Sequence, residues 1–91
     1  MPFEWDLVKN AKNLEQHAIS FEDATRLWNK PHVIILTKQV IGEDRFLILG
    51  HLNGKTHACV FTKRDENVRL ISCHRADKKL ERIFHAYFEK K

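Results

Sequence analysis

Histidine and arginine residues near the ends of the predicted strands are the side chains of this chain that could do chemistry. The sequence has six histidines and more Lys and Arg than Asp and Glu. Cleavage of a phosphodiester without a metal needs a base for the attacking hydroxyl, an acid for the leaving oxygen and cations for the phosphate. Histidine titrates near neutral pH and can be either base or acid. Arginine stays charged and holds phosphate through two parallel hydrogen bonds.

His74 is the first candidate for a proton-transfer group. It ends the last predicted strand, beside Arg75 and two residues from Ser72. The alternative is a surface histidine next to a helix start, since one histidine rarely defines a site without geometry. His17 lies between the first two predicted helices, where it could instead satisfy a terminal helix carbonyl. Both histidines stay open as candidates.

Three arginines could hold phosphate, namely Arg45, Arg64 and Arg69. The alternative is surface ion pairing with nearby acids, which contributes at most about 1 kcal/mol and would not require arginine. These acids are Glu43, Asp44, Asp65 and Glu66.

Other residues could form different sites, and we favour structural roles for them. Trp5 and Trp28 could stack on bases, but aromatics beside a helix cap or at helical spacing more often belong to the core. A zinc site of His57, Cys59, Cys73 and His74 is disfavoured, because neighbouring strand residues point to opposite faces. The two cysteines form no Cys-x-x-Cys motif, which suits reduced thiols in a cytosolic protein.

Size and charge limit the function further. The 91 residues predict one domain, residues 1–91, with a modest core. The net charge of +4 arises within residues 63–91, while residues 1–62 are neutral. A one-sided basic segment favours an anionic partner, most commonly nucleic acid; alternatively, its lysines only solvate a helix, namely Lys78, Lys79, Lys90 and Lys91.

No segment is long and apolar enough to cross a membrane, since the longest apolar run is four residues, as in Val33–Leu36. Glu4 and Asp6 stand where a signal peptide would be basic. We therefore expect a cytoplasmic protein with no membrane partner and no cofactor.

The chain begins with two predicted helices. The first starts near the N-cap Asp6, with a buried face of Leu7, Ala11, Leu14 and Ala18 and a polar stripe of Lys9, Asn13 and Gln16. The second has a capping box of Ser20 and Asp23. Its apolar face is Ala24, Leu27 and Trp28, and Pro31 ends it.

Four strands and a helix follow. The strands are predicted at His32–Thr37, Arg45–Leu52, Lys55–Thr62 and Val68–His74, with Asn53-Gly54 as a two-residue hairpin turn. The last helix has the apolar spacing of Leu80, Ile83, Phe84, Tyr87 and Phe88. The predicted fold class is α+β: two N-terminal helices, an antiparallel sheet of about four strands and a C-terminal helix.

The hairpins also predict which residues share a sheet face. Pairing Leu52 with Lys55, and Arg64 with Val68, collects Phe46, Ile48, Cys59, Phe61, Ile71 and Cys73 on a core face. The other face collects Arg45, Leu47, Leu49, Val60, Thr62, Leu70, Ser72 and His74, with Arg64 at the turn. We expect a cleft on this mixed face, although a one-residue slip would exchange the faces.

Three stretches together resemble the BrnT family of ribonuclease toxins. They are Phe3 to Ala24, Glu43-Asp44-Arg45-Phe46 with Gly50, and Thr62 to Ala76. The resemblance implies a fold similar to RelE-type toxins and a metal-independent endoribonuclease that inhibits translation. It also implies neutralisation by a BrnA-like antitoxin, which carries the DNA-binding part, so that operator DNA is contacted only through the complex.

The resemblance and the residue chemistry give one set of site residues. Catalytic candidates are His17, Arg45, Arg64, Arg69 and His74, and RNA-binding candidates are Lys9, Ser72, Arg75, Lys78 and Lys79. Asn13 also matches a residue type typical of the family.

The chain departs from the family pattern at several positions. Cys73 and His74 stand where Arg is common, Leu80 where Glu is common, and Asp65-Glu66 where Gly-Asp is frequent. His74 could supply a different acid, or it could mark a weakened toxin. The alternative function is a non-catalytic module that binds RNA, the ribosome or a protein partner. RNA sequence preference, ribosome dependence and stoichiometry do not follow from the sequence.

Overall fold

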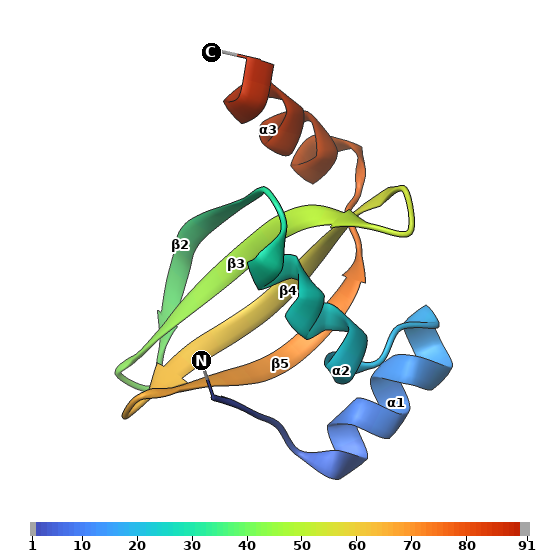
Figure 1. The fold of residues 1–91 in the computed structure, drawn as a ribbon. Helices are drawn as coiled ribbons and strands as arrows, with labels where there is room; N and C mark the ends of the chain where they lie inside the picture. Colours follow the sequence, from blue (N-terminus) through green and yellow to red (C-terminus); the bar gives the residue numbers. More distant parts are fainter. Residues whose placement is uncertain (1, 90–91) are drawn as a thin grey trace.

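The protein folds as one twisted sheet with helices on both faces, as the computed structural model of residues 2–89 shows (Figure 1). The predicted α+β class is confirmed, but the sheet has five strands, in the order β1-β5-β4-β3-β2. The elements are β1 (Phe3–Glu4), α1 (Leu7–His17), α2 (Phe21–Ala24), the 3₁₀ helix η1 (Thr25–Asn29), β2 (His32–Val40), β3 (Glu43–Leu52), β4 (Lys55–Arg64), β5 (Asn67–Arg75) and α3 (Lys78–Glu89).

The additional strand β1 runs parallel to β5, while the other pairs are antiparallel. No helix within residues 2–89 has the length and apolar character to span a membrane. Lys90 and Lys91 of the predicted basic tail lie outside the described residues.

The Asn53-Gly54 turn forms as predicted and sets the register of β3 and β4. Its residues have φ angles of 54° and 77°, the left-handed values that a tight hairpin requires. Leu52 therefore pairs with Lys55, and the rest of the predicted β3–β4 pairing follows.

The register of β4 and β5 differs from the prediction. Arg64 pairs with Asn67 rather than Val68, because Asp65 adopts a left-handed φ of 55° and closes a tighter turn. A register shift after Val60 then restores the predicted pairing of Cys59 with Cys73. Such a bulge moves the residues on one side of it to the opposite face. Phe61 consequently pairs with Leu70, and Leu70 is buried in the core rather than on the mixed face.

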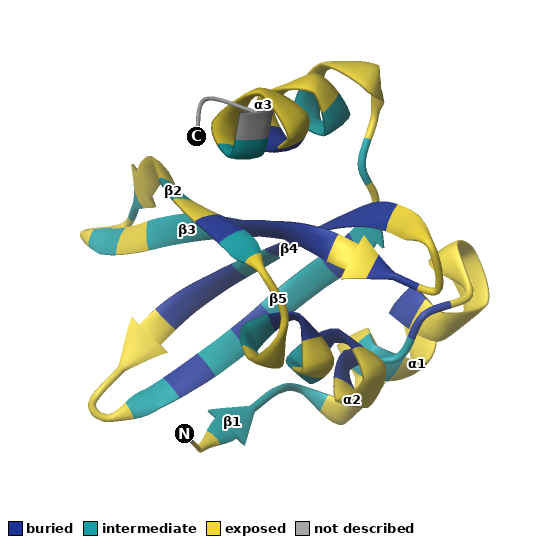
Figure 2. Ribbon diagram, turned by 45° about the horizontal axis from the view of Figure 1, so that its top comes forward, coloured by how far each residue is buried: buried dark blue, intermediate teal, exposed yellow. Residues whose placement is uncertain are grey.

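Both faces of the sheet are packed against helices, as the view in Figure 2 shows, with α3 above the sheet and α1 and α2 below it. The lower core contains the thiols and both tryptophans, which confirms the structural role predicted for Trp5 and Trp28. Trp28 contacts Phe3 and Phe61 edge-to-face, with ring centroids 5.0 and 5.1 Å apart. A Cβ at Gly50 would lie 3.0 Å from Leu27 Cδ2 and 3.3 Å from the Pro31 carbonyl oxygen, so a larger residue there would require these neighbours to shift.

The mixed face is not an open cleft along its whole length, because α3 covers part of it. A second core joins Val33, Leu47, Leu49, Ala58 and Phe84 there. Asp77 caps α3 by accepting from the Leu80 amide at 2.8 Å. Of the apolar face predicted for this helix, Phe84 is buried, whereas Ile83 and Tyr87 are exposed. The open part of the face lies towards the opposite end of the strands.

Helix α1 contacts the sheet through its polar stripe and not through the predicted apolar face. Leu7, Ala11, Leu14 and Ala18 are all exposed, Leu7 to 78% and Leu14 to 52%. Asn13, which was predicted on the polar stripe, is buried. The reason is a set of hydrogen bonds: Asn13 accepts from the Cys73 amide at 2.9 Å and donates to the Cys73 carbonyl at 2.8 Å. This side chain thereby replaces a neighbouring strand along the edge of β5.

Candidate functional site

His17 and His74 lie side by side at one end of the sheet, and we call them the histidine pair. Their ring centroids are 5.8 Å apart, with the rings inclined by 50°. His74 Nδ1 is 2.7 Å from the backbone carbonyl of Arg75. A carbonyl can only accept, so Nδ1 carries the hydrogen, and Nε2 of the neutral ring is left as an acceptor. Such a ring can take up a proton at Nε2.

Helix α1 brings the histidine pair together. The two bonds from Asn13 to Cys73 fix α1 along β5, and His17 follows one turn later, next to the residue that follows Cys73. Asn13 also donates to the Ile19 carbonyl at 2.9 Å. Ala18, with a φ of 57°, ends the helix in a left-handed turn. The position of His17 thus depends on a buried amide rather than on apolar packing.

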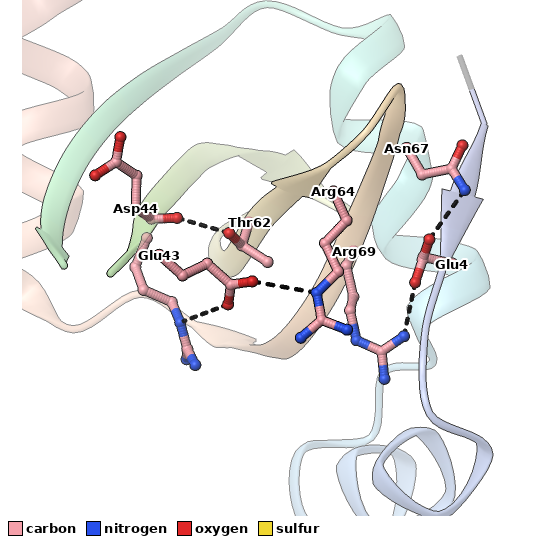
Figure 3. A network of polar contacts seen from close by, with 8 residues as sticks. Glu4, Glu43, Asp44, Thr62, Arg64, Asn67 and Arg69 are labelled. Atoms are coloured by element: carbon pink, nitrogen blue, oxygen red, sulfur yellow. Dashed lines mark hydrogen bonds and ion pairs between the residues drawn. The ribbon is translucent and has the colours of Figure 1, made fainter. Parts of the chain in front are cut away.

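Arg45, Arg64 and Arg69 gather at the other end of the strands together with two carboxylates, and we call this set the arginine cluster. Glu43 pairs with Arg64 at 3.1 Å and with Arg45 at 4.0 Å. Glu4 pairs with Arg69 at 2.7 Å (Figure 3). The ion pairs resemble the structural alternative considered for these arginines. The Arg64 side chain is half exposed, whereas those of Arg45 and Arg69 are 25% and 27% exposed.

Arg45 and Glu4 show how the arginine cluster differs from a simple set of surface ion pairs. The Nε atom of Arg45 is buried and has no hydrogen-bond partner among the described residues. Hydrogen bonds from Asn67 and from Arg69 lower the pKa of Glu4, which therefore keeps its negative charge and fixes Arg69. The Glu43 carboxylate, 4.0 Å away, is the negative charge nearest to this atom, so Arg45 is held within the cluster by charge rather than by a hydrogen bond.

The structure does not bring the histidine pair and the arginine cluster into one site. Arg69 and His74 lie on the same strand, five residues apart, which corresponds to about 17 Å at the usual rise of a strand. Helix α1 runs beside this strand between the two groups. Lys9 lies in the first turns of the helix. The positive charges of Lys9 and Arg69 both stabilise the negative charge of the Asp6 carboxylate. Basic residues therefore extend from one group towards the other.

The remaining RNA-binding candidates lie near the histidine pair. Ser72 and Arg75 are on β5, with Ser72 half-buried and Arg75 exposed. Lys78 and Lys79 begin α3 directly beyond this strand and are exposed. A single-stranded RNA that followed β5 would meet these side chains at one end and the arginine cluster at the other.

The cysteines and the remaining acids offer no metal centre. No group of three or more His, Cys, Asp or Glu side chains within residues 2–89 is arranged to hold a metal ion. Cys59 and Cys73 are buried free thiols that face each other across β4 and β5. The hydrogen bond with Cys73 and burial raise the pKa of Cys59 well above its usual range. The Cys59 thiol thus remains protonated, and both cysteines are parts of the core.

A comparison with known protein families identifies the family of this chain. The family described as "Ribonuclease toxin, BrnT, of type II toxin-antitoxin system" matches residues 5–79. The chain belongs to the BrnT family. No curated protein matches it. A type II toxin implies a cognate antitoxin and an RNA substrate, so the BrnT chain is a ribonuclease toxin with both kinds of partner.

Several residues that position the candidate site residues of this BrnT chain are not evident from its sequence. Glu4 was not connected with Arg69, because β1 is too short for a strand pattern. Asn13 was interpreted as a surface residue, although its bonds to Cys73 hold α1. The only sequence signal for Asn13 was its match to the family pattern.

Proposed function

We propose that this BrnT chain is a metal-independent endoribonuclease that inhibits translation and uses the histidine pair for proton transfer. His74 Nε2 takes the proton from a 2′-hydroxyl, whose oxygen attacks the adjacent phosphorus. His17, in its protonated form, gives a proton to the leaving 5′ oxygen. The products are a 2′,3′-cyclic phosphate and a 5′-hydroxyl. The observation that carries the proposal is the 5.8 Å separation of the two rings together with the free Nε2 of His74.

The arginine cluster has a separate role in this proposal. Arg45, Arg64 and Arg69 bind phosphates further along the strand of RNA, while Arg75 lies next to His74 and supplies positive charge near the reacting phosphate. Lys9, Ser72, Lys78 and Lys79 complete the path of the backbone. Binding energy along this path positions the RNA at the histidine pair.

The partners follow from the same proposal. A BrnA-like antitoxin neutralises the toxin, and operator DNA is contacted only through the complex. The apolar side chains exposed on α1 support a protein partner of this kind, since Leu7, Val8 and Leu14 are at least half exposed.

Cleavage of RNA in excess chelator tests the catalytic part. The purified toxin should cleave, and His74→Asn and His17→Asn should each lower the rate by about 10²- to 10⁴-fold, the usual contribution of a general acid or base. The fragments should carry 5′-hydroxyl ends. His32→Asn is the matched control, because His32 Nδ1 also bonds a backbone carbonyl, at 2.7 Å, yet lies three strands away.

Full activity in both histidine variants would contradict this assignment and direct attention to Glu43, the carboxylate between Arg45 and Arg64. A folded parent that binds RNA but leaves it intact, with and without ribosomes, would instead support a non-catalytic binding module.

A further inference from the structure

A hollow of about 440 Å³ lies beside the arginine cluster, at the end of the sheet where β3 begins and β4 ends. Its volume falls within the range of roughly 300–1,000 Å³ that is usual for small-molecule sites. Neither the histidine pair nor the arginines line it. The side chains and backbone around it are Ile41, Gly42, Glu43, Asp44, Phe46, Thr62 and Lys63.

One wall of the hollow is an aromatic ring held in a fixed orientation. Phe46 is stacked on Phe61, with centroids 5.3 Å apart and planes inclined by 19°. Phe61 is buried in the core, so Phe46 has a rigid support. Lys63 Nζ lies 5.2 Å from the centroid of Phe46. The ammonium lies over the ring, so a nucleobase that stacks on Phe46 displaces it from the ring face and leaves it to neutralise the adjacent phosphate.

A second wall supplies hydrogen-bond acceptors in a defined place. The backbone of Asp44 is fixed by the Thr62 hydroxyl, which donates to its carbonyl at 2.7 Å. The Asp44 side chain accepts one bond from Gln39 Nε2 at 3.2 Å. An ionised carboxylate only accepts and has room for several donors. The ligand edge that faces Asp44 must therefore donate.

A second hollow lies at the same end of the sheet but on the opposite face, because the side chains of successive strand residues alternate between the faces. It measures about 260 Å³ and shares Ile41 and Glu43 with the first, but it is lined by Arg45 and Arg64. Arg45 contributes the buried Nε without a hydrogen-bond partner among the described residues. One nucleotide therefore does not fill both hollows, and the cation that lines the first hollow together with Phe46 and Asp44 is Lys63.

We propose that the Phe46–Asp44 hollow is a base-recognition subsite for guanine in single-stranded RNA, with the adjacent phosphate at Lys63. Guanine presents two neighbouring donors, N1–H and the N2 amine, to a carboxylate, whereas adenine and uracil do not. The inference rests on the proposed ribonuclease function for its ligand class. In this proposal, this end of the sheet recognises a base that lies away from the cleaved bond.

Binding of short oligonucleotides tests the subsite without relying on cleavage. The probes are 2′-deoxy tetranucleotides that differ at one position, which is guanine, inosine, adenine or abasic. Fluorescence anisotropy with the intact protein should give about tenfold tighter binding for guanine than for adenine. Inosine, which lacks the N2 amine, should lie between the two.

Two variants and a control distinguish the contributions of the two walls of the hollow to binding. Asp44→Asn should abolish the guanine preference and leave adenine binding within about twofold. Phe46→Leu should weaken binding of every base-bearing probe by about tenfold, consistent with the loss of one stacked base, and should leave the abasic probe unchanged. Asp65→Asn is the matched control, because Asp65 lies in the next turn outside the hollow and Asn tolerates its φ of 55°.

Equal affinity of the parent for all four probes, or an unchanged preference in Asp44→Asn, would overturn the subsite. RNA cleavage by the parent in that case would leave the proposed function standing. A guanine preference in binding without any cleavage would support the subsite and contradict the nuclease proposal.

Discussion

His57 is the buried histidine of this protein, and its protonation is coupled to folding. It is 7% exposed, and its Nδ1 donates to the Lys55 carbonyl at 2.9 Å. Burial lowers the pKa of His57, and the nearby positive charge of Arg75 and the rings of His74 and His51 act in the same direction. The folded state therefore favours neutral His57.

The lowered pKa of His57 makes stability depend on pH. Below the ordinary histidine value of about 6.5, the unfolded chain binds a proton that the folded chain resists, so acid favours unfolding. Stability from this residue is present above pH 6.5 and is lost as the pH falls through the folded pKa. Urea unfolding between pH 7.5 and 5 should show a smaller loss in His57→Gln than in the parent or in the control His32→Gln. Parallel curves for all three proteins would refute the coupling.

At the scale of elements, α1 is held by amides rather than by its apolar stripe. Asn13→Ala removes two bonds to Cys73 and one to Ile19 and leaves buried groups unpaired, so it should lower the free energy of unfolding by about 2–4 kcal/mol. Leu14→Ala should change it by less than about 0.5 kcal/mol, because Leu14 is half exposed. Urea midpoints of the two variants provide the measurement. A larger loss for Leu14→Ala would show that the stripe is buried in solution.

The contrast between Asn13 and Leu14 also explains what the sequence could predict. Periodicity found α1 and its start at Asp6, and the Asn53-Gly54 turn fixed a register, because these signals are local. The face that α1 buries was mispredicted, since a buried amide paired with a strand edge has the same appearance in sequence as a surface residue. The bulge after Val60 escaped prediction for a similar reason: an added residue alters pairing without altering composition.

The candidate site, like the fold, could be predicted from the sequence only in part. The residue types suited to RNA chemistry were visible in the sequence, including His17, His74 and the three arginines. Their separation into a histidine pair and an arginine cluster was not, because it depends on where α1 is fixed along β5.

At the scale of the whole molecule, the separation of the two groups determines how RNA affinity depends on salt. If three arginines each neutralise a phosphate, the logarithm of the affinity should fall with the logarithm of salt with a slope contribution of about −2. Arg64→Gln should reduce the magnitude of the slope by about 0.7 for probes long enough to reach both groups. It should leave the slope unchanged for dinucleotides bound only at the histidine pair.

Measurements of RNA affinity at salt concentrations between about 50 and 300 mM test this arrangement. Lys30→Gln is the control, because Lys30 is exposed at the end of η1, apart from both groups. An equal slope change in the control would mean that only the net charge of +4 matters, and not the position of the arginines.

The two margins of the sheet are unequal. Along β5, the margin is closed by β1 and by the side chain of Asn13. Along β2, no further strand follows within the described residues, and Ile34 and Leu36 are exposed there. A sheet with one partly covered and one open margin extends most readily at the open margin. Two copies joined through β2 would cover both open margins, so strand-to-strand growth through β2 would end at a pair instead of continuing into a fibre.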